Sequence, residues 1–164
     1  MNVNLSCEQV ERKITRLYED NSDLKALAAG IAPGSANRGI YLFDNVNIPA
    51  VITFLAVSTL VHENDHTHKN YFLYRDTEGS GEWLFIPWDK DLTFGLNNGI
   101  GGIIATQDWP GDSRSPSHPF FGSQNHQKVD YKWNRLFDAV YADPTSRQMY
   151  LRRLRTLMDT YLQA

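Results

Sequence analysis

Two short runs of aromatic and β-branched residues on either side of a glycine-containing turn constrain this chain most. The runs are Tyr71–Arg75 and Trp83–Trp88, and the turn between them is Asp76–Gly81. Such a pattern is typical of a β-hairpin. The middle of the chain should therefore be an antiparallel strand pair.

The turn also predicts which residues of the hairpin face each other. If the turn centres near Gly79, antiparallel pairing places residues whose numbers sum to about 158 opposite one another. Asn70 should then face Trp88 and lie beside Asp89.

The longest apolar stretch, Pro49–Val61, predicts a helix that is packed on several sides, because apolar residues cover most of its circumference. Asn47 and Pro49 favour a helix start, since asparagine caps free amides and proline suits the first turn. The helix should end at the polar run His62–Asn70. It is well short of the roughly 20 residues that cross a bilayer, so we expect no membrane span.

The remaining pattern predicts a single α+β domain over residues 1–164, mostly helical, with the hairpin at its centre. Residues 107–130 hold prolines, glycines and serines with little apolar period and predict a long loop. The other predicted elements are helices over Ser6–Tyr18 and Ser22–Gly30, a connector over Pro33–Arg38, a helix over Tyr131–Tyr141, and a last helix that opens at Asp143-Pro144 and runs to Leu162.

Charge and cysteine content exclude several classes of protein. The net charge is -3, from 19 acidic and 16 basic residues. Nucleic-acid platforms carry a basic surplus, so no nucleic-acid partner is expected. Cys7 is the only cysteine, which excludes an internal disulfide and a cysteine-based zinc site.

Oxygen-bearing side chains should gather at the open end of the hairpin. Asp65 lies just upstream of Asn70, and Asp89 and Asp91 follow the second strand. Such hard ligands suit Mg²⁺, which takes one or two carboxylates and leaves its other positions to water and substrate phosphates. In protein kinases a catalytic Asp, an Asn five residues later and an Asp after the next strand pair occur in this order. Asp65 and Asn70 have that spacing.

The sequence around these residues resembles the CotH kinase family. The similar strings are NDHTHKNYFLYRD and EWLFIPWDKDLTFG, and the apolar helix DNVNIPAVITFLAV fits the helix that precedes them. The resemblance implies a kinase-like C-terminal lobe, ATP with Mg²⁺ or Mn²⁺, and phosphate transfer to Ser or Thr of a protein substrate.

The same resemblance implies roles for individual residues. Asp65 would be the catalytic carboxylate and Asn70 a metal ligand. Asp89 or Asp91 would be the second metal and nucleotide ligand, and the position of Asp89 beside Asn70 favours Asp89. Lys69 would neutralise phosphate beside Asp65 or balance the acidic cluster.

The sequence departs from the kinase pattern in one important respect. Nothing before Asp65 reads as a glycine-rich turn and a lysine-bearing strand, which kinases use to hold the nucleotide phosphates. We therefore expect an absent N-terminal lobe, a chain that is part of a longer protein, and weak binding of Mg-ATP by the chain alone.

Two other functions compete with the kinase hypothesis. A kinase-like scaffold without catalysis could serve as a binding module. In addition, His62, Glu63 and His66 match the H-E-x-x-H pattern in which two histidines one helical turn apart hold zinc and the glutamate activates water.

Overall fold

The computed structural model describes residues 14–61, 63, 70–94, 96–99, 102–105 and 134–163, with the side chains of all but 96–99 and 102–105. Within these residues the chain forms five helices and two separate two-stranded antiparallel sheets. The expectation of a mostly helical α+β fold is confirmed at this level. The elements are α1 (Ser22–Gly30), α2 (Arg38–Asn45), α3 (Ile48–Leu60), β1 (Tyr71–Arg75), β2 (Trp83–Pro87), β3 (Leu96–Gly99), β4 (Gly102–Ala105), α4 (Arg135–Ala142) and α5 (Pro144–Tyr161).

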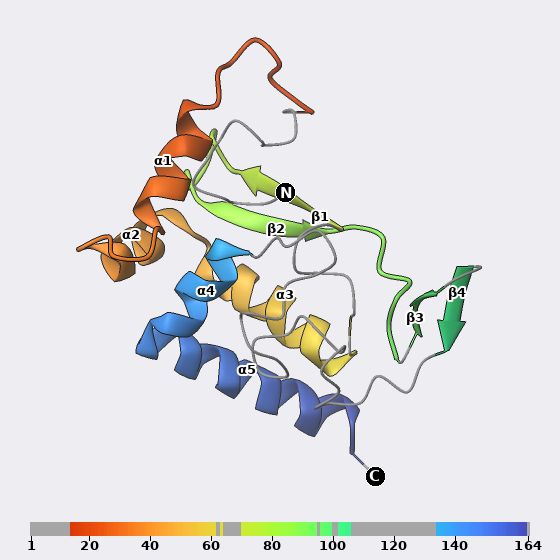
Figure 1. Cartoon of the computed structure of the whole chain (residues 1–164). Coiled ribbons are helices and arrows are strands. Elements are labelled where there is room, and N and C mark those ends of the chain that lie inside the picture. Colours follow the sequence, from red (N-terminus) through yellow and green to blue (C-terminus); the bar gives the residue numbers. More distant parts are fainter. Residues whose placement is uncertain are drawn as a thin grey trace.

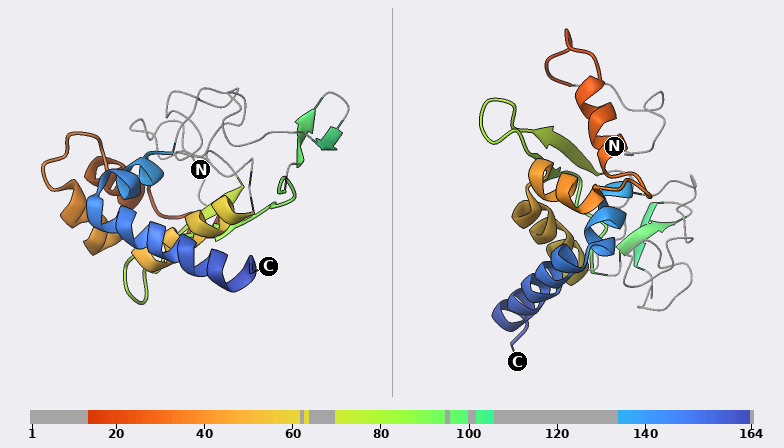
Figure 2. Two further views of the ribbon diagram at one scale, coloured as in Figure 1. Left: turned by 90° about the horizontal axis from the view of Figure 1, so that it is seen from below. Right: turned by 90° about the vertical axis from the view of Figure 1, so that its left-hand side faces the viewer.

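Helix α3 is the centre of the fold. It lies between the β1–β2 hairpin on one side and α5 on the other (Figure 1). The small β3–β4 sheet lies at the opposite end of the molecule from α1 and α2 (Figures 1 and 2). The two sheets therefore build different parts of the molecule, and β2 of the hairpin packs on α3.

The predicted start and burial of α3 are confirmed. The Asn47 side-chain oxygen accepts a hydrogen bond from the Ala50 amide at 3.0 Å, which satisfies a free donor of the first turn. More than half of the helix is buried, because it is covered from both sides. At its end the Glu63 amide donates to the Ser58 carbonyl at 2.9 Å, a bond typical of a helix C-terminus.

The hairpin has the predicted register. Tyr71 pairs with Pro87, and Arg75 pairs with Trp83. Beyond the last pair, the Trp88 amide donates to the Asn70 carbonyl at 3.2 Å, so Asn70 does face Trp88. At the other end, the Asn47 amide donates to the Trp83 carbonyl at 2.9 Å and fixes the start of β2 against the start of α3.

Aromatic rings join the hairpin to the helices. Tyr71 and Phe85, from the inner face of the hairpin, lie edge to face with centroids 4.6 Å apart. Phe85 also contacts Phe54 of α3 at 5.1 Å and Phe137 of α4 at 5.4 Å. These rings are buried, so their apolar area and ring geometry hold the hairpin in place.

Side-chain caps set the boundaries of the last two helices. The Asn134 oxygen accepts from the Leu136 and Phe137 amides, and α4 begins at Arg135 rather than at Tyr131; residues 131–133 lie outside the described residues. Asp143 caps α5, so the helix predicted from Asp143-Pro144 is confirmed and ends at Tyr161.

The N-terminal helix prediction is wrong where it can be compared. Ile14–Tyr18 form bends and turns, and Ile14, Leu17 and Tyr18 are 71%, 57% and 83% exposed. An amphipathic pattern stabilises a helix only when its apolar face is packed, and this face has no cover. The rest of that predicted helix lies outside the described residues.

The remaining elements differ less from their predicted boundaries. The helix over Ser22–Gly30 is confirmed, although Asn21 rather than Ser22 holds the cap position. Helix α2 follows the predicted connector and was not predicted, and neither was the β3–β4 sheet. The predicted loop over 107–130 lies outside the described residues. No described helix combines the length and apolarity needed to cross a membrane.

Candidate active site

The open end of the hairpin brings together two of the predicted ligands. Asn70 immediately precedes β1, Asp89 follows Trp88 at the end of β2, and the bond between the Trp88 amide and the Asn70 carbonyl joins the two segments. A one-residue slip would move every side chain of the hairpin to the other face, so the observed register is what sets this proximity.

Both residues have unusual backbone conformations. The φ angle is 62° at Asn70 and 51° at Asp89, in the left-handed region. Among non-glycine residues, Asn and Asp adopt this region most readily because their short polar side chains bond locally. Of the four described non-glycine residues with positive φ, three lie on the segments that leave the open end of the hairpin: Asn70, Asp89 and Phe94. Such strain is concentrated at functional sites.

The segment from Trp88 to Phe94, here called the acidic loop, is fixed at both ends. It begins at the Trp88 amide bond to Asn70 and ends where the Phe94 amide donates to the Val61 carbonyl at 2.9 Å, at the end of α3. In its middle, Leu92 is buried at 4% exposure. The loop carrying the carboxylates is therefore anchored to both the hairpin and the helix.

Side chains alternate along the acidic loop. Asp89 and Asp91 are exposed, whereas Lys90 is half-buried and its Nζ lies 5.4 Å from the centroid of the Phe54 ring. Lys90 thus faces the interior while its two neighbours face solvent.

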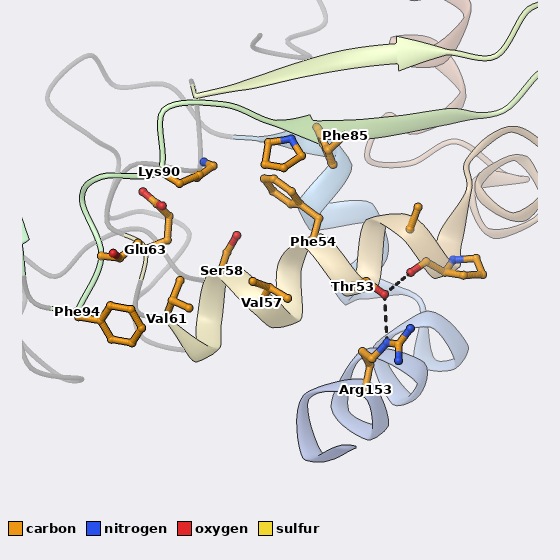
Figure 3. A pocket seen from close by; sticks show the side chains of 14 residues that line it. Thr53, Phe54, Val57, Ser58, Val61, Glu63, Phe85, Lys90, Phe94 and Arg153 are labelled. Atoms are coloured by element: carbon orange, nitrogen blue, oxygen red, sulfur yellow. Dashed lines mark hydrogen bonds between the residues drawn. The ribbon is translucent and has the colours of Figure 1, made fainter. Parts of the chain in front are cut away.

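Glu63 is a buried acidic residue, and the sequence predicts a role for it only within the zinc pattern. It is 4% exposed and lies with Lys90 at one end of a pocket between α3 and β2 (Figure 3). The sequence signal for this residue is a charged side chain directly after an apolar helix. It could not distinguish a buried carboxylate from a solvated one.

Asp65 and Lys69 lie outside the described residues, as do His62 and His66. Within the described part of the chain, no three His, Cys, Asp or Glu side chains gather as a metal site. Asn70, Asp89 and Asp91 offer one amide and two carboxylate groups, a donor set whose chemistry fits Mg²⁺ with room for water and phosphate ligands.

The zinc pattern requires its glutamate to lie on a helix between the two histidines. Helix α3 ends at Leu60, and the bond from the Glu63 amide to the Ser58 carbonyl is of the kind found at a helix terminus. Glu63 is not helical, which argues against a zinc hydrolase.

A family model described as CotH kinase protein matches residues 4–164. The chain belongs to the CotH kinase family. No curated protein and no solved structure matched it.

Membership of the CotH kinase family indicates kinase activity at the level of the family, with ATP and a divalent metal as its general requirements and a protein as its substrate. The match extends well beyond the strings around Asn70 and Asp89 and includes all five helices.

Proposed function

We propose that this CotH kinase family chain carries the catalytic carboxylates for transfer of phosphate from Mg-ATP to Ser or Thr of a protein. The observation that carries the proposal is the hairpin register, which brings Asn70 and Asp89 to one end with both residues in left-handed conformations. Two oxygen donors on adjacent, anchored segments are preorganised for a hard cation.

Asp89 is a better candidate than Asp91 for the principal metal ligand. Asp89 directly follows the residue that is hydrogen bonded to Asn70, whereas Asp91 lies two residues further along and next to the buried Leu92. Asn70 and Asp89 would hold the metal, and Asp91 could contact it through water. The bound metal would neutralise charge on the transferred phosphate.

Asp65 is assigned the role of accepting the proton from the substrate hydroxyl that receives the phosphate. It precedes Asn70 by five residues, the spacing at which kinases place the carboxylate that accepts the hydroxyl proton. Lys69, adjacent to Asn70, would balance negative charge on the phosphate oxygens.

The outer face of the hairpin offers a surface for the nucleotide base next to these ligands. Phe72 and Trp88 lie edge to face at 5.6 Å, and Trp88 is 61% exposed beside Asp89. The inner face of the same strands is buried against α3, so the outer face is the one available to a flat aromatic ligand.

Phosphate transfer from radiolabelled ATP to a protein rich in Ser and Thr tests the proposal, with the full-length product of the gene as enzyme. Asp65→Asn should lower the rate by about 100-fold or more, because general-base contributions are of that size. Asp89→Asn should cause a comparable loss, and Asp91→Asn a smaller one. Asp44→Asn, on the exposed surface of α2, is the matched control and should leave the rate unchanged.

Two outcomes would count against the proposal. Transfer that survives both Asp65→Asn and Asp89→Asn would remove these residues from catalysis. Retained binding of Mg-ATP with no transfer by the unaltered protein would instead identify a non-catalytic binding module.

A further inference from the structure

A long pocket lies along α3, behind the acidic loop and outside the ligand set assigned to phosphate transfer. Its volume is about 800 Å³, within the range of ligand-binding cavities. It is lined by α3 on one side and by β2 and the acidic loop on the other (Figure 3). Most of the lining is apolar, with Phe54, Val57 and Phe85 as typical members.

The pocket is elongated. Its lining begins at Pro49 in the first turn of α3 and continues to Val61 at the helix end, a distance of about 18 Å at 1.5 Å per residue. Figure 3 shows Thr53 and Arg153 at one end and Glu63, Lys90 and Phe94 at the other. This shape suits a narrow chain better than a compact ring system.

Charge distinguishes the two ends. At one end the buried carboxylate of Glu63 lies with the ammonium of Lys90, so the described lining of this end has no net charge. At the other end Arg153 is the only charged residue of the described lining. Two cations and one anion leave one positive charge in excess, located at the Arg153 end.

The guanidinium of Arg153 is positioned to bind an anion. Its Nε donates to the Thr53 hydroxyl at 3.1 Å, and that hydroxyl donates to the Pro49 carbonyl at 2.7 Å. These bonds orient the guanidinium at the pocket mouth and do not use its terminal nitrogens. A guanidinium held in this way can receive a carboxylate in a two-point hydrogen bond.

We propose that this pocket binds an amphiphilic monocarboxylate with an unbranched alkyl chain, the chemistry of a medium-chain fatty acid. Its carboxylate lies on Arg153 and its alkyl chain runs along α3 toward Lys90 and Phe94. Since the far end of the chain contacts the acidic loop, an occupied pocket stabilises the loop that carries Asp89. The binding itself is independent of phosphate transfer, so it is tested in the absence of nucleotide.

Isothermal titration of the 164-residue chain with decanoate is the direct test. A ligand of this size that fills the pocket should bind with a dissociation constant of about 10–100 µM. Decanol, which lacks the charge, should bind about 10-fold more weakly, and butyrate, which lacks the chain, should show no binding at the same concentrations.

Three variants locate the site. Arg153→Met should weaken the binding of decanoate about 10-fold. Arg152 is exposed on the same helix, as Arg153 is, but does not line the pocket, so Arg152→Met should change the dissociation constant by less than about 2-fold. Val57→Asp places a charge in the middle of the channel and should also weaken binding by about 10-fold or more. Val57 is 41% exposed, and circular dichroism confirms that each variant is folded.

Several results would overturn the inference. They are the absence of decanoate binding, equal affinity for decanol and decanoate, or equal losses from Arg152→Met and Arg153→Met. If decanoate does not bind and light scattering shows a dimer that Val57→Asp dissociates, a second copy of the chain covers this face instead.

Discussion

The left-handed conformation of Asp89 makes a prediction that separates the stability of the acidic loop from its function. At φ 51°, an ordinary side chain costs about 1–2 kcal/mol, because its Cβ approaches the following carbonyl. Aspartate lowers this cost by local hydrogen bonding, alanine cannot, and glycine has no Cβ. Glycine instead costs about 0.5–1 kcal/mol through the greater freedom of the unfolded chain.

These magnitudes fix an order of stability. Asp89→Ala should lower the free energy of unfolding by about 1 kcal/mol, and Asp89→Gly should be more stable than Asp89→Ala by about 0.5–1 kcal/mol. For a chain of this size the difference corresponds to a Tm difference of about 1–4 °C. Urea unfolding and differential scanning calorimetry measure both quantities.

Asp91 is the matched control. It lies two residues away on the same exposed loop and is not among the residues with positive φ. There the order should be reversed, with Asp91→Gly less stable than Asp91→Ala by about 0.5–1 kcal/mol. If alanine and glycine rank in the same way at both positions, the left-handed conformation of Asp89 is not a property of the molecule in solution.

The same variants test the role of the carboxylate. A ligand that binds only the folded protein raises its Tm, and the size of the shift follows the affinity. Asp89→Gly should fold at least as well as Asp89→Ala and yet lose the increase in Tm that Mg²⁺ with ATP gives the full-length product of the gene. A Mg-ATP shift that is unchanged in Asp89→Gly would remove Asp89 from the metal site and leave its strain without a functional reason.

Three further predictions concern the scaffold. Asn134→Ala removes two cap bonds and the 2.8 Å bond to the Tyr71 hydroxyl, so it should lower the free energy of unfolding in urea by about 2–3 kcal/mol. A loss below about 0.5 kcal/mol would show that water replaces the cap. Gly30→Ala places a Cβ 2.4 Å from the ring of Tyr41 and should destabilise the protein by about 1–3 kcal/mol, measured as a lower Tm; an unchanged Tm would mean that the ring moves freely. Burial raises the pKa of Tyr141 well above that of a free tyrosine. Its contribution to stability is therefore fully present below about pH 10 and is lost at higher pH, because the tyrosine of the unfolded chain ionises first. In urea unfolding, a Tyr141→Phe variant should lose less stability than the unaltered protein between pH 9 and about pH 11, and equal losses would refute this.

Local patterns in the sequence were enough to predict the parts of the fold that depend on local chemistry. The hairpin register follows from turn length and strand composition, and it placed Asn70 opposite Trp88 as observed. The caps of α3 and α5 follow from Asn47 and Asp143, whose short oxygen-bearing side chains reach the first free amides.

The parts that depend on distant contacts could not be predicted in this way. The apolar period of Ile14 and Leu17 predicts a helix, but whether an apolar face is covered depends on the rest of the fold. Helix α2 is amphipathic but only eight residues long, it buries only Leu42 fully, and Gly39 near its start disfavours a helix, so the short apolar run did not lead to a helix prediction. The roles assigned to Asp65 and Lys69 stay predictions, since both residues lie outside the described residues.

The geometry of the acidic loop follows from a mismatch in length between α3 and β2. The two segments run in the same direction and are tied at both ends, by the Asn47 amide to the Trp83 carbonyl and by the Phe94 amide to the Val61 carbonyl. From Asn47 to Val61 the helix advances about 21 Å, whereas a fully extended chain from Trp83 to Phe94 would advance about 36 Å.

The excess of about 15 Å has to be absorbed between the end of β2 and Phe94. A chain absorbs such slack by reversing direction, and single left-handed residues are a common means of doing so. Asp89 and Phe94, the two left-handed residues of this loop, stand at its beginning and at its end. The strain at Asp89 therefore comes from the ties to α3, so the helix that forms the core also determines where the carboxylate projects.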